Sequence, residues 1–420
     1  GDPQLDYPAI LVAGTNGKGS VTAYCSAMLR AAGLRVGAYY SPHLFRIHER
    51  IRCDGAEIPS RELDAAVARV RRAGGAALTY FECLTAAAML IFRERAVDIG
   101  VFEVGLGGRL DATNLVSAAV TVVTGISLDH RERLGATKRL ILGEKLGILR
   151  RGVPLVSRLD GAALERQARE AAAAVGAPCR MVRELARCAV RRVDWDGMTA
   201  RLRSRRRDYG VLRTRMIGAT QAANVATAAC VIETLDASLA SRRAALRKAP
   251  RRRRRDPLDR LAAKCSGRLG ARVVREGAAA GFLPGRFQVL SRKPLVVVDV
   301  SHNEESFCAA LDTLRTLDPP ERSVIVFGML AHKELGGFPS RAAREVELIV
   351  ATSLADRRSA RADALAAAFR EAPARARRAS VVASTRMAEA VETAKRAAGE
   401  RGVVLIMGSH VTVEEAAPHI

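Results

Sequence analysis

A glycine-spaced loop near the N-terminus constrains the fold of this chain more than any other stretch. Residues 14–20, Gly-Thr-Asn-Gly-Lys-Gly-Ser, lie between the apolar run 9–13 and the helix-like segment 21–32. Glycines let backbone N–H groups approach phosphate oxygens, the helix N-terminus adds partial positive charge, and the lysine can reach the terminal phosphates. The loop therefore predicts a nucleotide triphosphate site. Because Val12 and Gly19 depart from the generic phosphate-loop pattern, a tight strand-to-helix turn without a ligand is the alternative.

Length and composition indicate a globular protein of two or three domains. The chain has 420 residues, of which 49% are apolar, enough to form packed cores. It contains no uninterrupted apolar run of membrane length, and its N-terminus lacks a basic segment followed by an apolar one. Eight cysteines are scattered without C-x-x-C spacing. They are typical of buried thiols in a reducing compartment, so we expect a cytoplasmic protein with no membrane partner.

The net charge of +24 is unusual, and most of the 68 Lys and Arg residues are Arg. Nucleic-acid binding is one interpretation, but the arginines are spread along the chain and only 4% of residues are aromatic, which is few for base stacking. A bias toward Arg on solvated faces, or an anionic substrate, explains the charge as well. The clearest low-complexity segment is residues 241–255, which ends in five arginines and is expected to be solvated and mobile. We do not expect a nucleic-acid partner.

Apolar runs alternate with amphipathic segments along the first two thirds of the chain. This order predicts an α/β fold with a doubly wound parallel sheet, whose strands are buried on both faces. Alternating apolar and charged residues at 188–212 predict a small antiparallel excursion. The expected strands are residues 9–13, 34–40, 97–104, 118–126 and 153–156, and the expected helices are residues 21–32, 61–72, 81–95, 139–149 and 220–235.

Polar side chains follow four of these strands, close to the point where each strand ends. They are Lys18, Ser41, Glu103 and His130. Ligands of doubly wound sheets bind outside the carboxyl ends of the strands, so one such residue after each of four strands is hard to attribute to turns alone. The four residues are therefore expected to share one site.

A second α/β pattern without a phosphate loop fills the last third of the chain. Pro284 and Gly285 mark a hinge before it. We expect an ATP-binding domain at residues 1–283, a hinge at 284–294 and a smaller Rossmann-like α/β domain at 295–420. The expected strands of this last domain are residues 295–300, 323–327, 347–352, 379–383 and 403–407, and its expected helices are residues 305–317, 360–370 and 386–398.

Short motifs in a fixed order give a further indication. They are residues 12–20, 41–44 (Ser-Pro-His-Leu), 103–114, 129–130 (Asp-His), 134–137, 144–145 (Glu-Lys), Gln221 with Asn224, 284–287 (Pro-Gly-Arg-Phe), and Asp299 with His302 and Asn303. Together they resemble the folylpolyglutamate synthase/dihydrofolate synthase branch of the Mur ligase family, over nearly the whole chain. The resemblance implies an ATP-dependent, ADP-forming ligase that adds L-glutamate to the carboxylate of dihydropteroate or folate through an acyl phosphate. Such a reaction is phosphoryl transfer by positioning and charge neutralisation, followed by acyl transfer.

The resemblance also implies roles for residues at matching positions. The triphosphate would be held by Gly14, Thr15, Asn16, Gly17, Lys18, Gly19 and Ser20. Mg²⁺ would be ligated by Ser41, Glu103 and His130, an oxygen-rich set with one imidazole. Lys145 matches a lysine that the family carbamylates with CO₂, and the carbamate would support a second Mg²⁺. The simpler alternative for Lys145 is an exposed helix lysine beside Glu144.

Four further residues match family positions that hold adenine, phosphate and the incoming amino acid. They are Asn224, Arg286, Asp299 and His302. We expect Asp299 and His302 to act in catalysis together with Lys18 and Lys145. A buried structural histidine and a helix-capping aspartate are the alternatives for His302 and Asp299.

The chain departs from the family pattern in the second domain. Residues 299–304 read Asp-Val-Ser-His-Asn-Glu where the family usually reads Asp-Gly-Ala-His-Asn-Pro, and residues 332–334 read His-Lys-Glu where it usually reads Asp-Lys-Asp. Valine in place of glycine restricts φ, and Glu304 adds a negative charge beside the expected acyl phosphate, so we expect a less efficient site in this domain. The sequence also begins a few residues before its first strand, without the family's N-terminal helix.

Two other functions stay open from the sequence. One is a Mur-type ligase for a carboxylic acid without a pterin. The other is a nucleotide-binding protein with impaired catalysis that binds nucleic acid or a protein partner through its arginine-rich segment, with a steep salt dependence. The presence of Lys18, Glu103, His130 and Lys145 argues against this last function. We expect a monomer whose ligands are ATP, Mg²⁺, the folate-type acid and L-glutamate.

Overall fold

The computed structural model describes residues 1–247, 256–318, 320–373 and 379–420. They form two compact units, each with its own sheet and core. The first unit comprises Gly1–Arg191, Thr199–Arg215 and Gln221–Phe282, and the second comprises Arg192–Met198, Met216–Thr220 and Leu283–Ile420. The arginine run at residues 251–255, expected to be mobile, lies outside the described residues. No helix of the described ranges combines the length and hydropathy that a membrane span requires.

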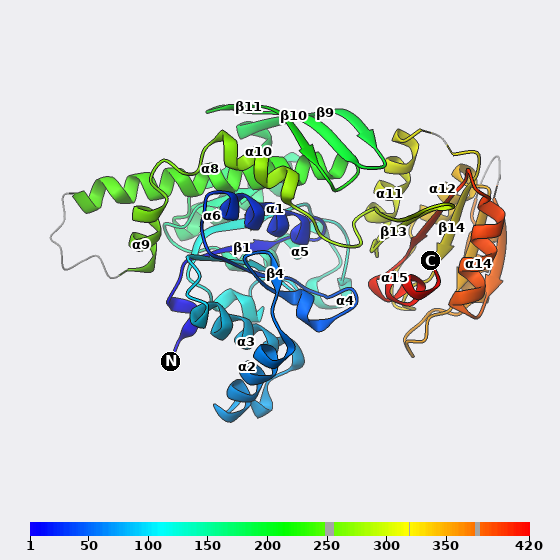
Figure 1. Cartoon of the computed structure of the whole chain (residues 1–420), viewed down its shortest axis with the longest axis horizontal. Coiled ribbons are helices and arrows are strands. Elements are labelled where there is room, and N and C mark those ends of the chain that lie inside the picture. Colours follow the sequence, from blue (N-terminus) through cyan, green and yellow to red (C-terminus); the bar gives the residue numbers. More distant parts are fainter. Residues whose placement is uncertain (248–255, 319, 374–378) are drawn as a thin grey trace. The chain divides into compact units, whose positions relative to one another are not determined.

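The first unit is built on an eight-stranded sheet (Figure 1). Its strand order is β4-β3-β2-β5-β1-β6-β7-β8, and neighbours pair in parallel except at β2–β3 and β3–β4, which are antiparallel. The central strands consist almost wholly of buried residues, as a parallel sheet covered on both faces requires. The strands are β1 (Ala9–Ala13), β2 (Val36–Tyr39), β3 (Ile51–Cys53), β4 (Ala56–Glu57), β5 (Ile99–Glu103), β6 (Ala118–Val123), β7 (Leu155–Ser157) and β8 (Cys179–Met181).

Helices cover both faces of this sheet. In Figure 1, α1, α8 and α10 lie on one side of it, and α2 and α3 lie on the other. The buried rings of Tyr7, Tyr39, Phe92 and Phe102 join α3 to the sheet, with neighbouring centroids 5.4 to 6.1 Å apart. The helices are α1 (Lys18–Ala31), α2 (Ser60–Arg72), α3 (Tyr80–Glu94), α4 (Arg131–Leu134), α5 (Lys138–Lys145), α6 (Ala162–Val175), α7 (Val182–Leu185), α8 (Ala219–Arg247), α9 (Pro257–Lys264) and α10 (Ala271–Ala280).

The expected excursion is a separate three-stranded sheet of order β11-β10-β9. Short turns join its strands β9 (Ala186–Asp194), β10 (Gly197–Ser204) and β11 (Asp208–Thr214). Along β10, buried and exposed residues alternate from Ala200 to Ser204, which is the pattern of a strand with one solvated face.

The second unit has a six-stranded sheet of order β12-β13-β17-β14-β15-β16. Only β12 runs antiparallel to its neighbour among these strands. The rings of Phe307, Phe327, Phe338 and Phe369 form the centre of its core. The strands are β12 (Gln288–Arg292), β13 (Leu295–Asp299), β14 (Ser323–Phe327), β15 (Leu348–Thr352), β16 (Ser380–Ser384) and β17 (Val403–Met407), and the helices are α11 (Glu304–Thr316), α12 (Phe338–Glu345), α13 (Ala362–Glu371), α14 (Met387–Ala398) and α15 (His410–Ala416).

The predicted α/β class is confirmed, and most predicted elements lie within three residues of their observed bounds. One bound is clearly wrong, because residues 241–247 belong to helix α8 and not to a mobile segment. Arg242 fixes this end of α8, since its guanidinium pairs with Asp256 and with Asp259 on α9. The β3–β4 hairpin and the helices α6, α9, α10 and α12 were not predicted.

Candidate functional site

The loop of residues 14–20 leads from β1 into α1, as predicted. Gly17 is the N-cap residue of α1 and has a left-handed backbone, with φ of 85°. Gly14 has φ of 147°, and a methyl group on it would lie 1.8 Å from Thr124 Oγ1. Both positions therefore require glycine, because a side chain would meet strain at either and a steric clash at Gly14. The first N–H groups of α1 have no acceptor within the helix, as at any helix N-terminus, so they can donate to an anion bound at the loop.

A second segment, the four residues that follow β6, supports this loop. The backbone N–H of Thr15 donates to Gly125 O at 2.8 Å, and Thr124 Oγ1 donates to Asn16 O at 2.7 Å. Asn16 Nδ2 donates to Ser127 Oγ at 3.0 Å. The sequence analysis missed Thr124 and Ser127 as parts of the site. A Thr and a Ser directly after a buried parallel strand were the signal that could have found them.

Two lysines converge on the phosphate loop. Lys18 Nζ donates to Thr15 O at 3.0 Å, and Lys145 Nζ donates to Gly14 O at 2.8 Å. Lys145 is only 5% exposed, so the alternative of an exposed helix lysine is wrong. Burial lowers the pKa of Lys145 to about 7, with a further lowering from the charge of Lys18 and a partial opposing effect of Asp129 and Asp111.

Tight packing at the end of α5 positions Lys145 beside the phosphate loop. A methyl group on Gly108 would lie 2.9 Å from Lys145 O and 3.0 Å from Glu144 O, so only glycine allows this approach. The N–H of Arg109 donates to Glu144 O at 3.0 Å. The carboxylate of Asp111 accepts from Leu106 N at 2.8 Å, which fixes the same glycine-rich turn after β5.

The structure brings Ser41 and Glu103 together, because β2 and β5 are neighbours in the sheet. Ser41 N donates to Glu103 Oε2 at 3.1 Å, and Glu103 is 4% exposed. His130 follows β6 with a left-handed backbone, and its ring nitrogens lie 3.9 Å from Asp129 Oδ2 and 3.8 Å from Glu132 Oε1.

The side chains of Ser41, Glu103 and His130 offer ligand atoms that fit a hard cation which also binds phosphate oxygens. The described part of the chain contains no group of three or more His, Cys, Asp and Glu side chains that could hold a metal alone. Mg²⁺ is usually held by one or two carboxylates, by water and by substrate phosphates. A buried Glu103 beside the loop matches that requirement.

Asn224 of α8 lies beside Gly17 of the phosphate loop. Its side chain is 3% exposed, and Nδ2 donates to Gln221 Oε1 at 3.1 Å. Within the described ranges no donor reaches Asn224 Oδ1, although the atom is buried. A methyl group on Gly17 would lie 2.6 Å from this oxygen. A buried acceptor aimed at the phosphate loop fits a donor group on a nucleotide.

Three of the predicted residues lie in the second unit. The carboxylate of Asp299 accepts from the N–H of Phe287 at 2.8 Å, from the N–H of Ser301 at 2.9 Å and from Ser301 Oγ. Burial raises the pKa of Asp299, while the Ser301 hydroxyl and the charge of Arg286 oppose the rise. The helix-capping alternative is wrong, because Asn303 is the N-cap residue of α11.

His302 and Arg286 belong to the same unit as Asp299, and Arg286 lies close enough for its charge to act on that carboxylate. His302 Nδ1 lies 3.2 Å from Val300 O, a carbonyl that can only accept, so Nδ1 is the donor. The His302 ring centroid lies 6.2 Å from that of His410, which begins α15 beside the end of β17. Arg286 Nε is buried, and no acceptor among the described residues contacts it.

Two of the departures from the family pattern, Val300 and Glu304, have local explanations. Val300 is buried, does not have a left-handed backbone, and donates its N–H to Gly285 O at 2.9 Å. Glu304 accepts from Gly337 N at 2.7 Å, so its carboxylate anchors the turn that precedes α12. The valine therefore fits without backbone strain, and the glutamate has a structural partner.

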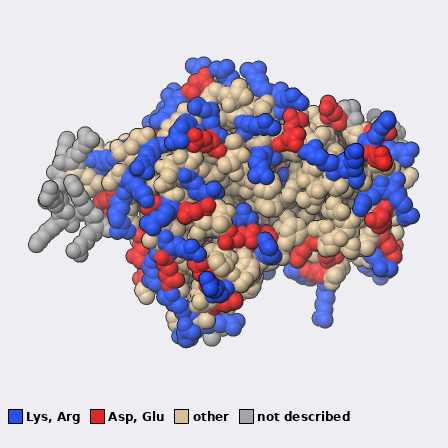
Figure 2. Space-filling view, in the orientation of Figure 1, with Lys and Arg blue, Asp and Glu red and all other residues tan. Residues whose placement is uncertain are grey.

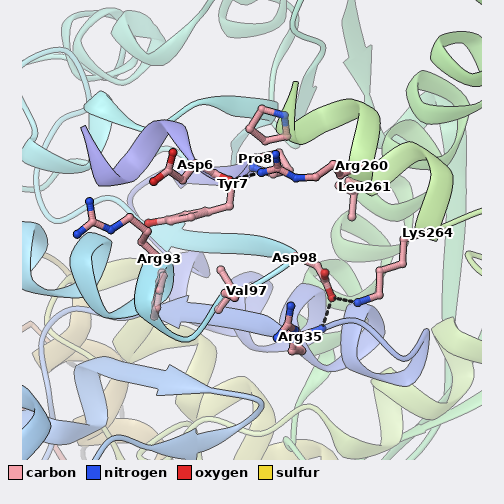
Figure 3. Close-up of a pocket in the computed structure, with 13 residues that line it drawn as sticks. Asp6, Tyr7, Pro8, Arg35, Arg93, Val97, Asp98, Arg260, Leu261 and Lys264 are labelled. Atoms are coloured by element: carbon pink, nitrogen blue, oxygen red, sulfur yellow. Dashed lines mark hydrogen bonds and ion pairs between the residues drawn. The ribbon is translucent and has the colours of Figure 1, made fainter. Parts of the chain in front are cut away.

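A cavity of about 340 Å³ lies at the opposite, amino end of the first sheet (Figure 3). Figure 3 shows Lys264 of α9 reaching Asp98, and their Nζ and Oδ2 atoms are 2.6 Å apart. Asp98 also accepts from Arg35 N at 2.7 Å, and Arg260 Nη2 donates to Asp6 O at 2.8 Å. These contacts join α9 to the segments that precede β1 and β5. The phosphate loop lies at the opposite, carboxyl end of β1.

Comparison with protein families identifies the class. The Mur ligase middle domain matches residues 12–232, and the Mur ligase glutamate ligase domain matches residues 285–410. The chain therefore belongs to the Mur ligase family of ATP-dependent, ADP-forming ligases.

Individual relatives identify the branch. The chain is 33% identical over 341 residues to the dihydrofolate synthase/folylpolyglutamate synthase of Escherichia coli, an alignment that covers 78% of this chain and 68% of the relative. Within the Mur ligases, it belongs to the folylpolyglutamate synthase/dihydrofolate synthase family. Two further curated relatives are longer proteins, and the alignments span 46% and 47% of their length.

Solved structures agree with this assignment. The E. coli FolC structure in complex with DHPP and ADP matches with a TM-score of 0.81 and 28% identity, over 99% of this chain and 90% of that one. The Yersinia pestis bifunctional folylpolyglutamate synthase/dihydrofolate synthase, complexed with AMPPNP and Mn, matches with a TM-score of 0.80 and 30% identity, over 100% and 91% of the two chains.

Proposed function

We propose that this chain couples ATP hydrolysis to the addition of L-glutamate to a folate-type carboxylate, either dihydropteroate or a reduced folate. The observation that carries the proposal is the phosphate loop with Lys18, Lys145 and Asn224 all closing on it. Family membership adds the substrate class, because the matched relatives are named for both reactions.

The phosphate loop performs the first step by positioning. The N–H groups of the α1 N-terminus and Lys18 hold the triphosphate, and an oxygen of the substrate carboxylate attacks the γ-phosphorus as ADP leaves. Ser41, Glu103 and His130 would hold Mg²⁺ against the phosphates, where the cation neutralises charge on the transferred group. Nucleotide, metal and acid are the ligands that we assign to the first domain, residues 1–283.

The second domain, residues 295–420 after the hinge at 284–294, would supply the acceptor. Asp299 and His302 bind and orient the incoming glutamate, and Arg286 adds positive charge for a phosphate. The glutamate amine attacks the acyl carbonyl, inorganic phosphate leaves, and an amide forms. The buried carboxylate of Asp299 is placed to attract the ammonium form of the amine before it loses a proton.

Lys145 is part of this proposal as a carbamate. A buried lysine whose amine is neutral can react with CO₂: the amine nitrogen bonds to the carbon, one proton is released to solvent, and the resulting anionic carbamate beside Lys18 could support a second Mg²⁺. The carbamate would remove the repulsion between the two lysines. We further propose a monomer that acts in the cytoplasm without a nucleic-acid partner; the eight cysteines are all unpaired thiols.

The direct test measures ADP formation by the purified chain. Turnover is expected with ATP, Mg²⁺ and L-glutamate when dihydropteroate or a reduced folate is added, and omission of any one of them should stop it. Absence of ADP formation with every pterin acid offered would refute the proposal. Faster turnover with an acid that carries no pterin would instead assign the chain to a different substrate.

A further inference from the structure

Arg158 also lies at the phosphate loop, although no sequence motif includes it. It follows β7 directly, and its N–H donates to Val123 O at 2.9 Å, which places it beside the end of β6. A methyl group on Gly17 would lie 3.6 Å from Arg158 Nη2, and one on Gly125 would lie 3.5 Å from the same nitrogen. The end of the half-buried guanidinium therefore lies between the loop and the segment that supports it.

The sheet order explains why Arg158 is there. β1, β6 and β7 are consecutive neighbours that all run in parallel, so their carboxyl ends meet at one edge of the sheet. β7 thus adds a fifth strand end to the four that the sequence analysis recognised. Gly17 is flanked by Asn224 from α8 and by Arg158 from β7, and both approach closely because Gly17 has no side chain.

Two permanently basic side chains, Lys18 and Arg158, therefore approach one short loop beside the buried amine of Lys145. A polyanion bound at the loop would be attracted by both charges. A guanidinium is planar, keeps its charge at all relevant pH values and can donate two parallel hydrogen bonds to a phosphate.

We propose that Arg158 binds the phosphate chain of the nucleotide, at the end nearer the nucleoside. The location follows from its neighbours, because Arg158 and Asn224 both approach Gly17, and Asn224 lies on the side expected to hold adenine. This inference rests on the proposed nucleotide site. It adds a binding residue that approaches the phosphates from outside the glycine loop.

A purely structural role for Arg158 makes a different prediction. If Arg158 only braced the loop, its removal would lower the stability of the ligand-free chain and would weaken all ligands through the distorted loop. If it binds phosphate, its removal weakens phosphate-containing ligands alone and leaves adenosine binding unchanged.

The experiment compares the full chain with Arg158→Gln, Arg158→Lys and the control Arg151→Gln. Arg151 is exposed in the turn before β7, so the control loses the same charge from the same segment. Calorimetric titrations use ADP, inorganic tripolyphosphate and adenosine, and melting temperatures are measured without ligand. Arg158→Gln should bind ADP and tripolyphosphate about 10-fold to 100-fold more weakly, with unchanged adenosine binding and no loss of ligand-free stability. Arg158→Lys should lie between it and the unmodified chain.

Several outcomes would overturn the assignment. Equal ADP affinity in the unmodified chain and Arg158→Gln would show that the guanidinium does not contact the nucleotide. Weaker binding of adenosine alone would show that the Arg158 guanidinium contacts the base. An equal loss of ADP affinity in Arg151→Gln would show that the effect comes only from the lower net charge. If the unmodified chain bound no ADP, the proposed nucleotide site itself would fail, which is a result distinct from the other three.

Discussion

Replacement of the buried Lys145 by methionine should stabilise the ligand-free protein while it abolishes ligase activity. Methionine keeps the length and apolar character of the lysine stem but removes the amine from a site that disfavours its charge. The fall in the Lys145 pKa from 10.5 to about 7 corresponds to roughly 5 kcal/mol, at about 1.4 kcal/mol per pH unit. Loss of the Nζ hydrogen bond to Gly14 O offsets about 1 kcal/mol of this. A gain of roughly 3 to 4 kcal/mol near pH 7 is therefore expected.

The pH dependence carries a definite sign. The unfolded chain binds the Lys145 proton up to about pH 10.5, whereas the folded chain binds it only below about pH 7. Between these values the unfolded state binds more protons, so the stability of the unmodified protein rises with pH. The advantage of methionine is then largest at and below pH 7 and shrinks through pH 9, where it should be roughly 2 kcal/mol smaller.

Urea unfolding followed by circular dichroism measures this difference, in buffer free of CO₂, Mg²⁺ and nucleotide. The matched control is Lys138→Met, which removes an exposed lysine from the start of the same helix. Lys145→Met should raise the unfolding midpoint at pH 7 and Lys138→Met should not. The reasoning is refuted if both variants behave alike, or if the gain from Lys145→Met does not change between pH 7 and pH 9.

Three further predictions concern the site and its scaffold. Glu103→Ala should lower the rate of ADP formation about 100-fold or more, because the carboxylate would hold Mg²⁺ against the bound phosphates; steady-state kinetics check this. Lys145→Ala should lose activity that added acetate or formate partly restores, and full activity without either would dismiss the carbamate. Asp98→Ala should cost about 1 to 3 kcal/mol in urea unfolding, since Lys264 and the N–H of Arg35 both lose their acceptor, whereas exposed Asp160→Ala should cost almost nothing.

The residues at the carboxyl ends of the strands were the part of the site that the sequence could predict. Apolar parallel strands are long, continuous and easily recognised, and the residue after each strand must lie at the carboxyl edge of the sheet. The hairpin of β3 and β4 separates β2 from β5 along the chain, yet the sheet order places β2, β5, β1 and β6 side by side. The expected proximity of Ser41 and Glu103 agrees with the structure for this reason, because a hydrogen bond joins the two residues; their role as metal ligands stays a prediction.

Side chains that reach the loop through tertiary packing could not be predicted in this way. Arg158 follows a strand whose place in the sheet is set by long-range pairing, and the sequence does not state that place. The end of α8 was misjudged for a related reason. A run rich in arginine predicts a solvated segment, but Arg242 has acidic partners beyond the described helix, and these hold residues 241–247 in helical form.

Glu144 and Lys145 show one thing that the sequence does not give: which of two adjacent helix residues points into the core. Adjacent residues of a helix point about 100° apart, so the sequence Glu-Lys near the end of an amphipathic helix leaves open which of the two faces the core. The structure turns Glu144 outward to pair with Arg109 at 3.3 Å, and it turns Lys145 inward to the carbonyl of Gly14. Gly108 decides between them, because its lack of a side chain lets the turn after β5 pack on the carbonyl oxygens of both residues. A side chain at position 108 would push α5 away from that turn, and the buried amine on which the proposed carbamate depends would be lost with the contact.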